Sequence, residues 1–595
     1  MTRQTPTIDL SFDALRAAYR EQRLTPRALM LQLRARAQSL SGYNVYIHPL
    51  DAAELEPYLL ALEQRQPDEL PLYGLPFAIK DNIDLAGIPT TVACPAYAYT
   101  PSQSATVVAR LIELGALPTG KTNLDQFATG LNGQRSPYGG CRNSRVAEYP
   151  SGGSSSGSAL AVALGLASFA LGTDTAGSGR IPAALNHLAG TKPTRGIVST
   201  HGVVPACRSL DCIAFLTRQP REAGELLALT ARIDQADAYS RRNPAWNAAR
   251  HAGAAGSFRF GIPAAPEWLD CREAPRLFAS ARAALESLGG VAVEIDFAPF
   301  MAAARLLYEG PYAAERYAAF GDMIERDPQA VLPVIRQIVA PSRDTSAATL
   351  FQSQHRLQAL KAECDRAIDG LDFVMTPTYA RAPTIAELQA EPVLRNSELG
   401  LYTNFMNLLD YAAVATPAGF LANGLPWGVT LFGRAFTDQY LIGSAQSLSD
   451  ALFATAAASP IATIASDRAR VVVCGAHLQG LPLNHQLLTR GARLIEKTLS
   501  APNYRLYALA GGPIKRPAML RSDTGGAAIE VEVWELPSAE LGSFLTGIPA
   551  PLGLGKLQLA DGSWETGFIC ESSGLAGAED ITAFGGWRAW LSARI

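Results

Sequence analysis

The stretch "YPSGGSSSGSALAVALGLASFALGTDTAGSGRIPAALN", residues 149–186, holds two clusters of small polar residues separated by an apolar run. A flexible Gly/Ser linker is one interpretation of this pattern. It is disfavoured because residues 158–165 are apolar at helical spacing and "ASFALGTDT" (167–175) is typical of a buried strand. The two clusters are therefore expected to flank elements of a folded core.

A second interpretation rests on a match to G-x-S-x-G at residues 153–157, with Ser155 at its centre. In a nucleophile elbow this motif directly follows a strand. Here it follows "RVAEYPSG" (145–152), in which Pro150 and Gly152 interrupt any strand. We therefore interpret the match at Ser155 as coincidental.

The third interpretation makes the two clusters parts of one site. The first lies at the start of a helix expected near Ser158, and the chain then returns along a strand to the second. A turn there can point several backbone N–H groups at one place, as an oxyanion hole requires. We predict that Ser178 is the attacking hydroxyl and Ser154 a relay. The predicted oxyanion hole consists of Thr175, Ala176, Gly177 and Ser178.

Composition limits the class of protein. The chain has 595 residues, of which 48% are hydrophobic, and a formal net charge of −3. Its length predicts two or more domains, and its balanced charge argues against a nucleic-acid partner. The longest weakly polar stretch, residues 159–172, is too short and too rich in small residues to span a membrane. The opening residues lack the apolar region of a signal peptide.

Cysteine and histidine usage argues against a metal centre. The eight cysteines are scattered without a C-x-x-C pair, and the seven histidines show no ligand spacing. We expect free thiols in a reducing compartment, and hence a cytoplasmic location. We expect no metal and no other cofactor.

Strand and helix patterns alternate through most of the chain. Buried strands are predicted at "LPFAIKDNIDL" (75–85) and "GALPTGKTNL" (115–124), with a helix at 104–115 between them. This alternation predicts an α/β fold in which helices cover a central sheet. Further helices are predicted at 11–22, 26–40 and 274–290, and further strands at 258–264, 291–297, 371–384 and 425–433.

The sequence changes character near residue 450. Residues 456–467 are small, rich in alanine and interrupted by Pro460, which predicts a linker between a first domain at 1–455 and a second at 468–595. The second domain is expected to be a smaller, strand-rich α+β domain, because alternating segments are separated there by Gly and Pro turns.

Residues 152–194, "GGSSSGSALAVALGLASFALGTDTAGSGRIPAALNHLAGTKPT", resemble the amidase-signature family of serine hydrolases. Family features recur in "LPFAIKDNID" (75–84), "GKTNLDQFATG" (120–130) and "ATPAGFLANGLPWGVTLFG" (415–433). The resemblance implies the amidase-signature fold with a central mixed sheet over roughly residues 10–450.

The same resemblance implies a Ser–cis-Ser–Lys triad. The nucleophile is then Ser178, the serine held by a cis peptide bond is Ser154, and the base is Lys80. The usual motif has glycine where this chain has Ala176. An alanine keeps the backbone N–H, so it can still serve an oxyanion hole.

A lysine acts as a base near pH 7 only where burial favours its neutral form. Lys80 follows "YGLPFAI", an apolar strand expected to end in the interior, although lysines at strand ends more often reach the surface. Lys121 is an alternative base on sequence alone, and only the resemblance decides for Lys80. A histidine base would be His187 or His201, the nearest in sequence, and His187 suits a helix or loop position better.

Two C-terminal segments extend the resemblance to the allophanate hydrolases, over essentially the whole chain. They are "VVVCGAHLQGLPLNHQLLTRGA" (471–492) and "TGFICESSGLAGAEDITAFGGWRAWL" (566–591). The implied substrate is allophanate (urea-1-carboxylate), a small anionic ureide whose carboxylate is held by Tyr308 and Arg316, with Gly130 lining the acyl pocket. Spacing alone would rather pair Arg316 with Glu315 or Glu309.

The resemblance implies a reaction in two stages. Ser178 attacks the carbamoyl carbon and ammonia leaves, after which water releases N-carboxycarbamate. A C-terminal domain with a γ-glutamyl cyclotransferase-like core then speeds decay of this product to ammonia and carbon dioxide. His477 is the expected catalytic residue there, because it lies at a strand-to-loop transition beside glycines and can carry a proton near neutrality. A structural role for His477 is the alternative, and nearby His485 is expected on the surface.

The implied partners are a second copy of the chain in a homodimer and a functional link to a separate urea carboxylase. Breakdown of urea and of triazine-derived ureides would both supply allophanate. A broader amidase, or the amidase subunit of a tRNA amidotransferase, is the alternative function, and it leaves the C-terminal domain unexplained.

Overall fold

The computed structural model describes residues 8–248, 253–254, 257–453, 468–490, 492–511 and 515–594. Contacts between residues divide the chain into two compact units. The large unit comprises Leu10–Phe12 and Ala37–Ala462, and the small unit comprises Met1–Asp9, Asp13–Arg36 and Thr463–Ile595. The predicted linker at 456–467 lies outside the described residues, so the domain boundaries at 455 and 468 stay predictions.

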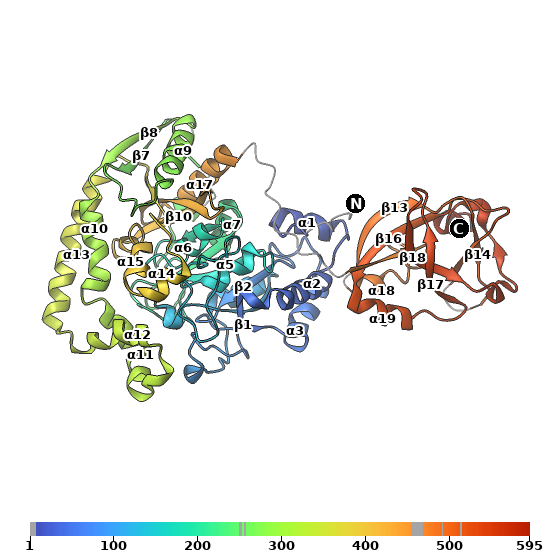
Figure 1. Ribbon diagram of the computed structural model, residues 1–595, viewed down its shortest axis with the longest axis horizontal. Coiled ribbons are helices and arrows are strands. Elements are labelled where there is room, and N and C mark those ends of the chain that lie inside the picture. The colour runs from blue at the N-terminus through green and yellow to red at the C-terminus, as the bar shows by residue number, and fades with distance from the viewer. Residues whose placement is uncertain are drawn as a thin grey trace. The chain divides into compact units, whose positions relative to one another are not determined.

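A mixed sheet forms the centre of the large unit (Figure 1). It has 11 strands, in the order β1-β3-β2-β4-β6-β5-β10-β11-β9-β7-β8. Strands β3, β2 and β4 pair in parallel, as do β9, β7 and β8, whereas the strands between these two groups pair antiparallel. The strands are β1 (Tyr46–Pro49), β2 (Pro76–Lys80), β3 (Leu117–Thr122), β4 (Phe169–Asp174), β5 (Ala189–Lys192), β6 (Cys212–Thr217), β7 (Phe258–Pro263), β8 (Gly290–Ile295), β9 (Phe373–Pro377), β10 (Tyr411–Phe420) and β11 (Pro426–Arg434).

Helices cover this sheet, which explains why its central strands are buried along their whole length. Every residue of β2, β4 and β6 is buried, as expected for strands covered on both faces. The helices of the large unit are α3 (Ala52–Glu63), α4 (Thr106–Glu113), α5 (Ser156–Ala163), α6 (Arg180–Leu185), α7 (Pro220–Thr230), α8 (Ala245–Ala248), α9 (Ala274–Ser287), α10 (Ala298–Glu309), α11 (Ala313–Arg326), α12 (Pro333–Val339), α13 (Ala347–Ala367), α14 (Ile385–Ala390), α15 (Leu394–Leu399), α16 (Phe405–Leu408) and α17 (Asp438–Phe453).

The predicted α/β fold with a central mixed sheet is confirmed. The strands expected at 75–85 and 115–124 contain β2 and β3, and these two strands are neighbours. The helix expected near Ser158 is α5, which begins two residues earlier, at Ser156. Gly157 lies within it because a Cβ there would approach the Val45 carbonyl oxygen to 2.2 Å, so only glycine lets the helix pack this closely.

The small unit is strand-rich, as predicted. A five-stranded sheet has the order β13-β16-β12-β18-β17, and a three-stranded sheet has the order β15-β14-β19. Its core includes the buried Trp534, Trp587 and Trp590. The strands are β12 (Arg468–Val473), β13 (Arg493–Leu499), β14 (Tyr504–Ala508), β15 (Pro517–Arg521), β16 (Glu530–Pro537), β17 (Leu552–Gln558), β18 (Trp564–Cys570) and β19 (Glu579–Asp580), and the helices are α18 (His485–Leu488), α19 (Ser538–Thr546) and α20 (Trp587–Ser592). Most of α1 (Phe12–Arg20) and α2 (Pro26–Ser39) also belongs to this unit, except Phe12 and Ala37–Ser39, which belong to the large unit.

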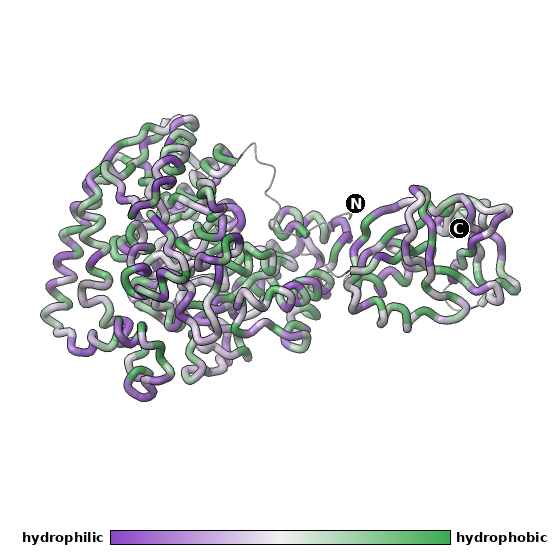
Figure 2. The backbone as a smooth tube through the Cα atoms, in the orientation of Figure 1, coloured by the Kyte–Doolittle hydropathy of each residue, from purple (hydrophilic) through white to green (hydrophobic). Residues whose placement is uncertain are grey.

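Apolar residues of the helices lie where the helices are buried. Hydrophobic and hydrophilic residues alternate along α13, whose buried residues include Leu357 and Leu360 (Figure 2). Within the described part of the chain, no helix is both long enough and apolar enough to cross a bilayer.

Candidate active site

Lys80 is the last residue of β2, a central strand of the large sheet, and its side chain is fully buried. Its Nζ lies 2.8 Å from Ser154 Oγ and 2.8 Å from Thr173 Oγ1, a hydroxyl of the neighbouring strand β4. The structure thus brings together the predicted base and the predicted relay serine, which are far apart in sequence. The short contact allows a proton to pass between them.

The environment of Lys80 favours a neutral amine. Burial lowers the pKa of Lys80 from its ordinary 10.5 to about 7, and the positive charge of Arg316 lowers it further, whereas Asp125, Asp211 and Asp174 oppose the shift. A large fraction of the lysine is therefore unprotonated near neutral pH, as a general base must be.

Ser154 follows Gly153 through a cis peptide bond, as the resemblance implies. Its carbonyl oxygen accepts a hydrogen bond from the Asp125 N–H at 3.2 Å. A Cβ on Gly153 would lie 2.2 Å from Asp125 Oδ2, so no side chain fits at that position. The loop containing Asp125 therefore fixes the backbone on both sides of the cis bond.

The Ser155 hydroxyl is hydrogen-bonded to the central sheet. Its Oγ donates to the Thr173 carbonyl oxygen at 3.2 Å and accepts from the Thr173 N–H at 3.3 Å, and the residue is fully buried. These bonds hold its hydroxyl against strand β4. The structure therefore agrees with the interpretation of the G-x-S-x-G match as coincidental.

Ser178 lies between β4 and α6, in the second serine cluster. Its Oγ is 3.5 Å from the Gly130 carbonyl oxygen, and its own carbonyl oxygen accepts from the Ser155 N–H at 3.3 Å. Only 3% of the residue is exposed. The two serine clusters therefore meet, and the predicted acyl-pocket residue Gly130 lies beside the predicted nucleophile.

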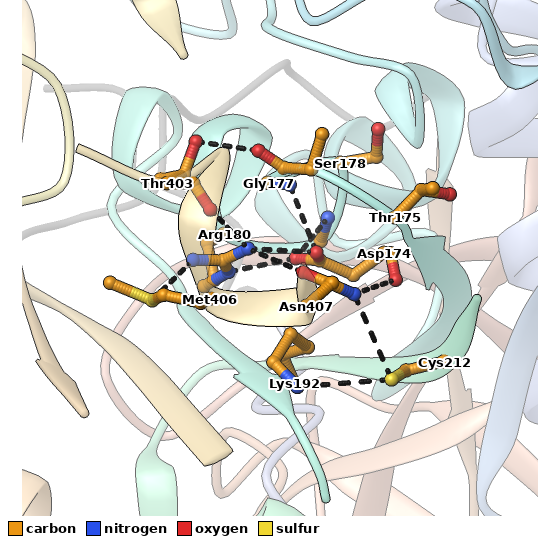
Figure 3. Close-up of polar contacts among 12 residues, drawn as sticks. Asp174, Thr175, Gly177, Ser178, Arg180, Lys192, Cys212, Thr403, Met406 and Asn407 are labelled. Carbon is orange, nitrogen blue, oxygen red and sulfur yellow. Dashed lines mark hydrogen bonds and ion pairs between the residues drawn. The ribbon is translucent and has the colours of Figure 1, made fainter. Parts of the chain in front are cut away.

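Asp174, at the end of β4, organises the turn that carries Ser178 (Figure 3). Its carboxylate accepts from the N–H groups of Gly177 at 2.9 Å and Gly179 at 3.1 Å. It also forms a fully buried ion pair with Arg180, through two hydrogen bonds of 2.9 Å. Because two hydrogen bonds fix the guanidinium and carboxylate planes together, this pair holds the turn rigidly.

The Ala176–Gly177 peptide group of this turn is bonded on both sides. Thr403 Oγ1 donates to the Ala176 carbonyl oxygen at 2.7 Å, while the Gly177 N–H donates to Asp174. The Gly177 N–H is therefore not free to bind an oxyanion, which corrects the prediction for Gly177. For Thr175, Ala176 and Ser178, the described residues supply no acceptor for the backbone N–H, and these three stay candidate donors.

Arg316, on α11, is buried and has Tyr308 of α10 beside it, with the guanidinium carbon 5.9 Å from the Tyr308 ring centroid. One guanidinium nitrogen donates to Thr129 Oγ1 at 3.1 Å. The neighbouring Glu315 carboxylate is instead bonded to the N–H and Oγ of Ser209, each at 2.7 Å. Among the described side chains no carboxylate pairs with Arg316, so the predicted pairing with Glu315 does not form, and the side chain of Glu309 lies outside the described part of the structure.

Two residues of this site were missed by the sequence prediction. Thr173 Oγ1 contacts Lys80, and the buried Asp211 carboxylate accepts from Thr175 Oγ1 at 2.5 Å and from the N–H groups of Ala206 and Cys207. Burial raises the pKa of Asp211 to about 6. Thr173 lies in the predicted strand that leads to the second serine cluster, which was the available signal for it, whereas no local pattern marked Asp211.

The alternative bases have other contacts. Lys121 Nζ lies 3.3 Å from Asp81 Oδ1 and is fully buried in that ion pair. His187 stacks on Phe420 with ring centroids 4.6 Å apart, and burial lowers its pKa to about 4. His201 is exposed. These contacts favour structural roles for all three.

In the small unit, His477 follows β12 and lines a pocket of about 230 Å³. Its Nε2 lies 3.0 Å from Gln486 Oε1, and its ring stacks on Phe568 at a centroid distance of 5.1 Å. Burial lowers the pKa of His477. His485 is exposed, as expected, and its Nδ1 donates to the Pro482 carbonyl oxygen at 2.9 Å. Across the described ranges, no cluster of three or more His, Cys, Asp or Glu side chains could hold a metal ion.

Two family models match this chain. The amidase model matches residues 33–442, and the model of the allophanate hydrolase C-terminal domain matches residues 469–592. The triad residues all lie in the first match and His477 lies in the second.

Known proteins match this chain over most of its length. The urea amidolyase of Lachancea kluyveri is 42% identical over 551 residues, covering 88% of this chain and 30% of that protein. The chain thus spans less than a third of the length of the urea amidolyases that it matches. The solved structure of Kluyveromyces lactis allophanate hydrolase is 36% identical, with a TM-score of 0.72 and coverage of 98% of this chain and 99% of that one.

A more distant relative matches a smaller share of this chain. The A-type subunit of the glutamyl-tRNA(Gln) amidotransferase of Natronomonas pharaonis is 32% identical over 416 residues, covering 64% of this chain and 96% of that protein.

Since the amidase model covers most of the chain, this protein belongs to the amidase family of hydrolases, and it joins that domain to the C-terminal domain of the allophanate hydrolases.

Proposed function

We propose that this chain hydrolyses allophanate at its terminal carbamoyl group. The observation that carries the proposal is the buried Arg316 guanidinium, which bonds to Thr129, next to Gly130 and Ser178, and has no carboxylate partner among the described residues. Burying a charge without a counterion is costly, so a substrate carboxylate would complete this site. The names of the relatives that match over both units support the same substrate.

In the first stage, neutral Lys80 takes the proton of Ser154, and Ser154 takes that of Ser178 as its Oγ attacks the carbamoyl carbon. The backbone N–H groups of Thr175, Ala176 and Ser178 are the candidates to stabilise the oxyanion of the tetrahedral intermediate. The C–N bond to the terminal nitrogen then breaks, and ammonia leaves with the returned proton. Water hydrolyses the acyl-enzyme and releases N-carboxycarbamate. The sum is allophanate plus water giving N-carboxycarbamate and ammonium.

In the second stage, His477 of the small unit delivers a proton to the nitrogen of N-carboxycarbamate. The N–C bond breaks, carbon dioxide leaves, and carbamate remains. Carbamate takes one more proton and gives ammonia and a second carbon dioxide. Histidine suits this step because its pKa lies near neutrality.

We also propose a cellular location, an oligomeric state and a source of the substrate. We place the enzyme in the cytoplasm as a homodimer, receiving allophanate from a separate polypeptide that carboxylates urea. The urea amidolyases support this link, because in them the matching region is part of a chain more than three times as long as the match.

The alternative of a broader amidase or the amidase subunit of an amidotransferase has less support. The match to the amidotransferase covers only 64% of this chain, whereas the allophanate hydrolase structure matches 98% of it.

Ammonia release from allophanate, biuret, glutamine and a simple amide tests the proposal. Biuret is the matched control, because it has the same carbamoyl group but an uncharged amide in place of the carboxylate. Loss of a charged partner for a buried arginine costs on the order of 2–4 kcal/mol, so we expect kcat/KM for allophanate to exceed that for biuret by about 100-fold or more. A higher kcat/KM for glutamine or a simple amide would refute the proposed substrate.

A further inference from the structure

The pocket beside His477 in the small unit has polar groups at one place and apolar walls elsewhere. Its apolar lining includes Leu552 and Phe568, and its polar side chains are His477, Gln486 and Arg516. No acidic residue is among the residues that line it. A pocket with cationic and neutral polar groups but no carboxylate is suited to an anion.

The backbone that follows β12 provides a row of unused donors. In this loop the N–H groups of Leu478 and Gln479 are bonded, to the Gly475 carbonyl oxygen and to Glu532 Oε2. For the preceding three residues, 475–477, the described part of the chain offers no acceptor for the backbone N–H, and all three residues line the pocket. Successive free N–H groups of this kind bind anions in many proteins.

Arg516 lines the pocket and directly precedes Pro517, which this loop contacts. A Cβ on Gly475 would lie 1.9 Å from Pro517 Cγ, so the loop packs directly on the residue that follows Arg516. Arg516 is partly exposed, and within the described ranges its guanidinium forms no ion pair or side-chain hydrogen bond. It is thus a positive charge in the pocket that no described carboxylate neutralises.

The His477 ring is held in one orientation. Gln486 Oε1 can only accept a hydrogen bond, so Nε2 carries the hydrogen in the neutral ring and Nδ1 is left for proton exchange. Stacking on Phe568 and an edge contact with Phe544, at a centroid distance of 5.4 Å, fix the ring plane.

We propose that this pocket binds a small dicarboxylate, with Arg516 holding one carboxylate and the backbone N–H groups of residues 475–477 holding the other. The inference rests on the proposed function, because N-carboxycarbamate has two carboxylates joined by one NH group. It adds Arg516 as the residue that selects a dianion, and it places both carboxylates within reach of the His477 ring.

Malonate tests this proposal, since its CH₂ replaces the NH of N-carboxycarbamate and cannot be protonated or cleaved by His477. Isothermal titration uses the full chain carrying Arg316→Met, so that the carboxylate site of the large unit is disabled. We expect one malonate to bind per chain. Adding Arg516→Met should weaken the Kd at least tenfold, whereas Arg516→Lys should weaken it less, because the charge is kept and the two-pronged geometry is lost.

The matched control is Arg521→Met, at the far end of β15 from Pro517, where the arginine is exposed and does not line the pocket. Malonate affinity should be unchanged in this variant, and far-UV circular dichroism checks that each variant is folded. Failure of the Arg316→Met chain to bind malonate, or equal affinity with and without Arg516→Met, would overturn the proposal. Because binding is measured without turnover, failure of the chain to hydrolyse allophanate would refute the proposed function and leave this result intact.

Discussion

The two sites of this protein differ in how far they are removed from water. In the large unit Lys80 and Ser154 are 0% exposed and Arg316 is 2% exposed, whereas His477 and Arg516 in the small unit are partly exposed. A lysine must be buried to lose its proton near pH 7, but a histidine titrates there without burial. The residue type that transfers the proton, lysine or histidine, therefore sets how deeply each site must be buried.

The largest effect on turnover should come from removing the nucleophile of the site in the large unit. Ser178→Ala should lower kcat for the first ammonia release by about 10⁴-fold or more, because the acyl-enzyme can no longer form. Malonate binding to the small unit should be unchanged in this variant, which would separate the two sites. Ammonia release from allophanate and malonate titration measure the two quantities.

Ser155→Ala is the matched control for that variant, since Ser155 is the serine that the G-x-S-x-G motif would have indicated. Within the described residues its hydroxyl bonds only to the backbone of Thr173, so kcat should stay within about tenfold of wild type. Near-normal turnover by Ser178→Ala together with loss of turnover in Ser155→Ala would reverse the assignment.

A smaller loss is expected from Arg316→Met. Removing the guanidinium should lower kcat/KM for allophanate by about 10²- to 10³-fold, while kcat/KM for biuret, which has no carboxylate, should change little. Arg316→Lys should lie between the two, because it keeps the charge but loses the fork geometry. If the loss were equal for both substrates, Arg316 would have only a structural role.

Local patterns in the sequence were enough to predict the central strands and the meeting of the two serine clusters. They were not enough for Lys80, which was chosen over Lys121 by resemblance. Its contact with Ser154 spans 74 residues of sequence, and no local pattern encodes such a contact. The structure distinguishes the two lysines, because Lys121 forms an ion pair with Asp81 whereas Lys80 contacts Ser154.

The oxyanion hole shows a second limit. The sequence indicated the turn at 175–178 but not the direction of each N–H. That direction depends on Asp174, which takes the Gly177 N–H, and on Thr403, which lies more than 200 residues away in sequence. Arg316 is a similar case. Spacing favoured Glu315 or Glu309 as its partner, but the Glu315 carboxylate accepts from Ser209, which the fold brings beside it.

The smallest effect is a difference in pH dependence between the two stages. The pKa of Lys80 is lowered from 10.5 to about 7, so its neutral fraction rises about tenfold between pH 6 and pH 8. The kcat/KM for the first ammonia release should rise with pH over this range and then level off.

His477 acts as a proton donor and burial lowers its pKa, so its protonated fraction, and the carbon dioxide release that depends on it, should fall as pH rises. Subtracting the carbon dioxide release of a His477→Gln variant, measured by mass spectrometry, isolates the part due to His477. A first stage that slows with rising pH would contradict Lys80 as the base, and a His477-dependent release that rises in parallel with the first stage would contradict its role as proton donor.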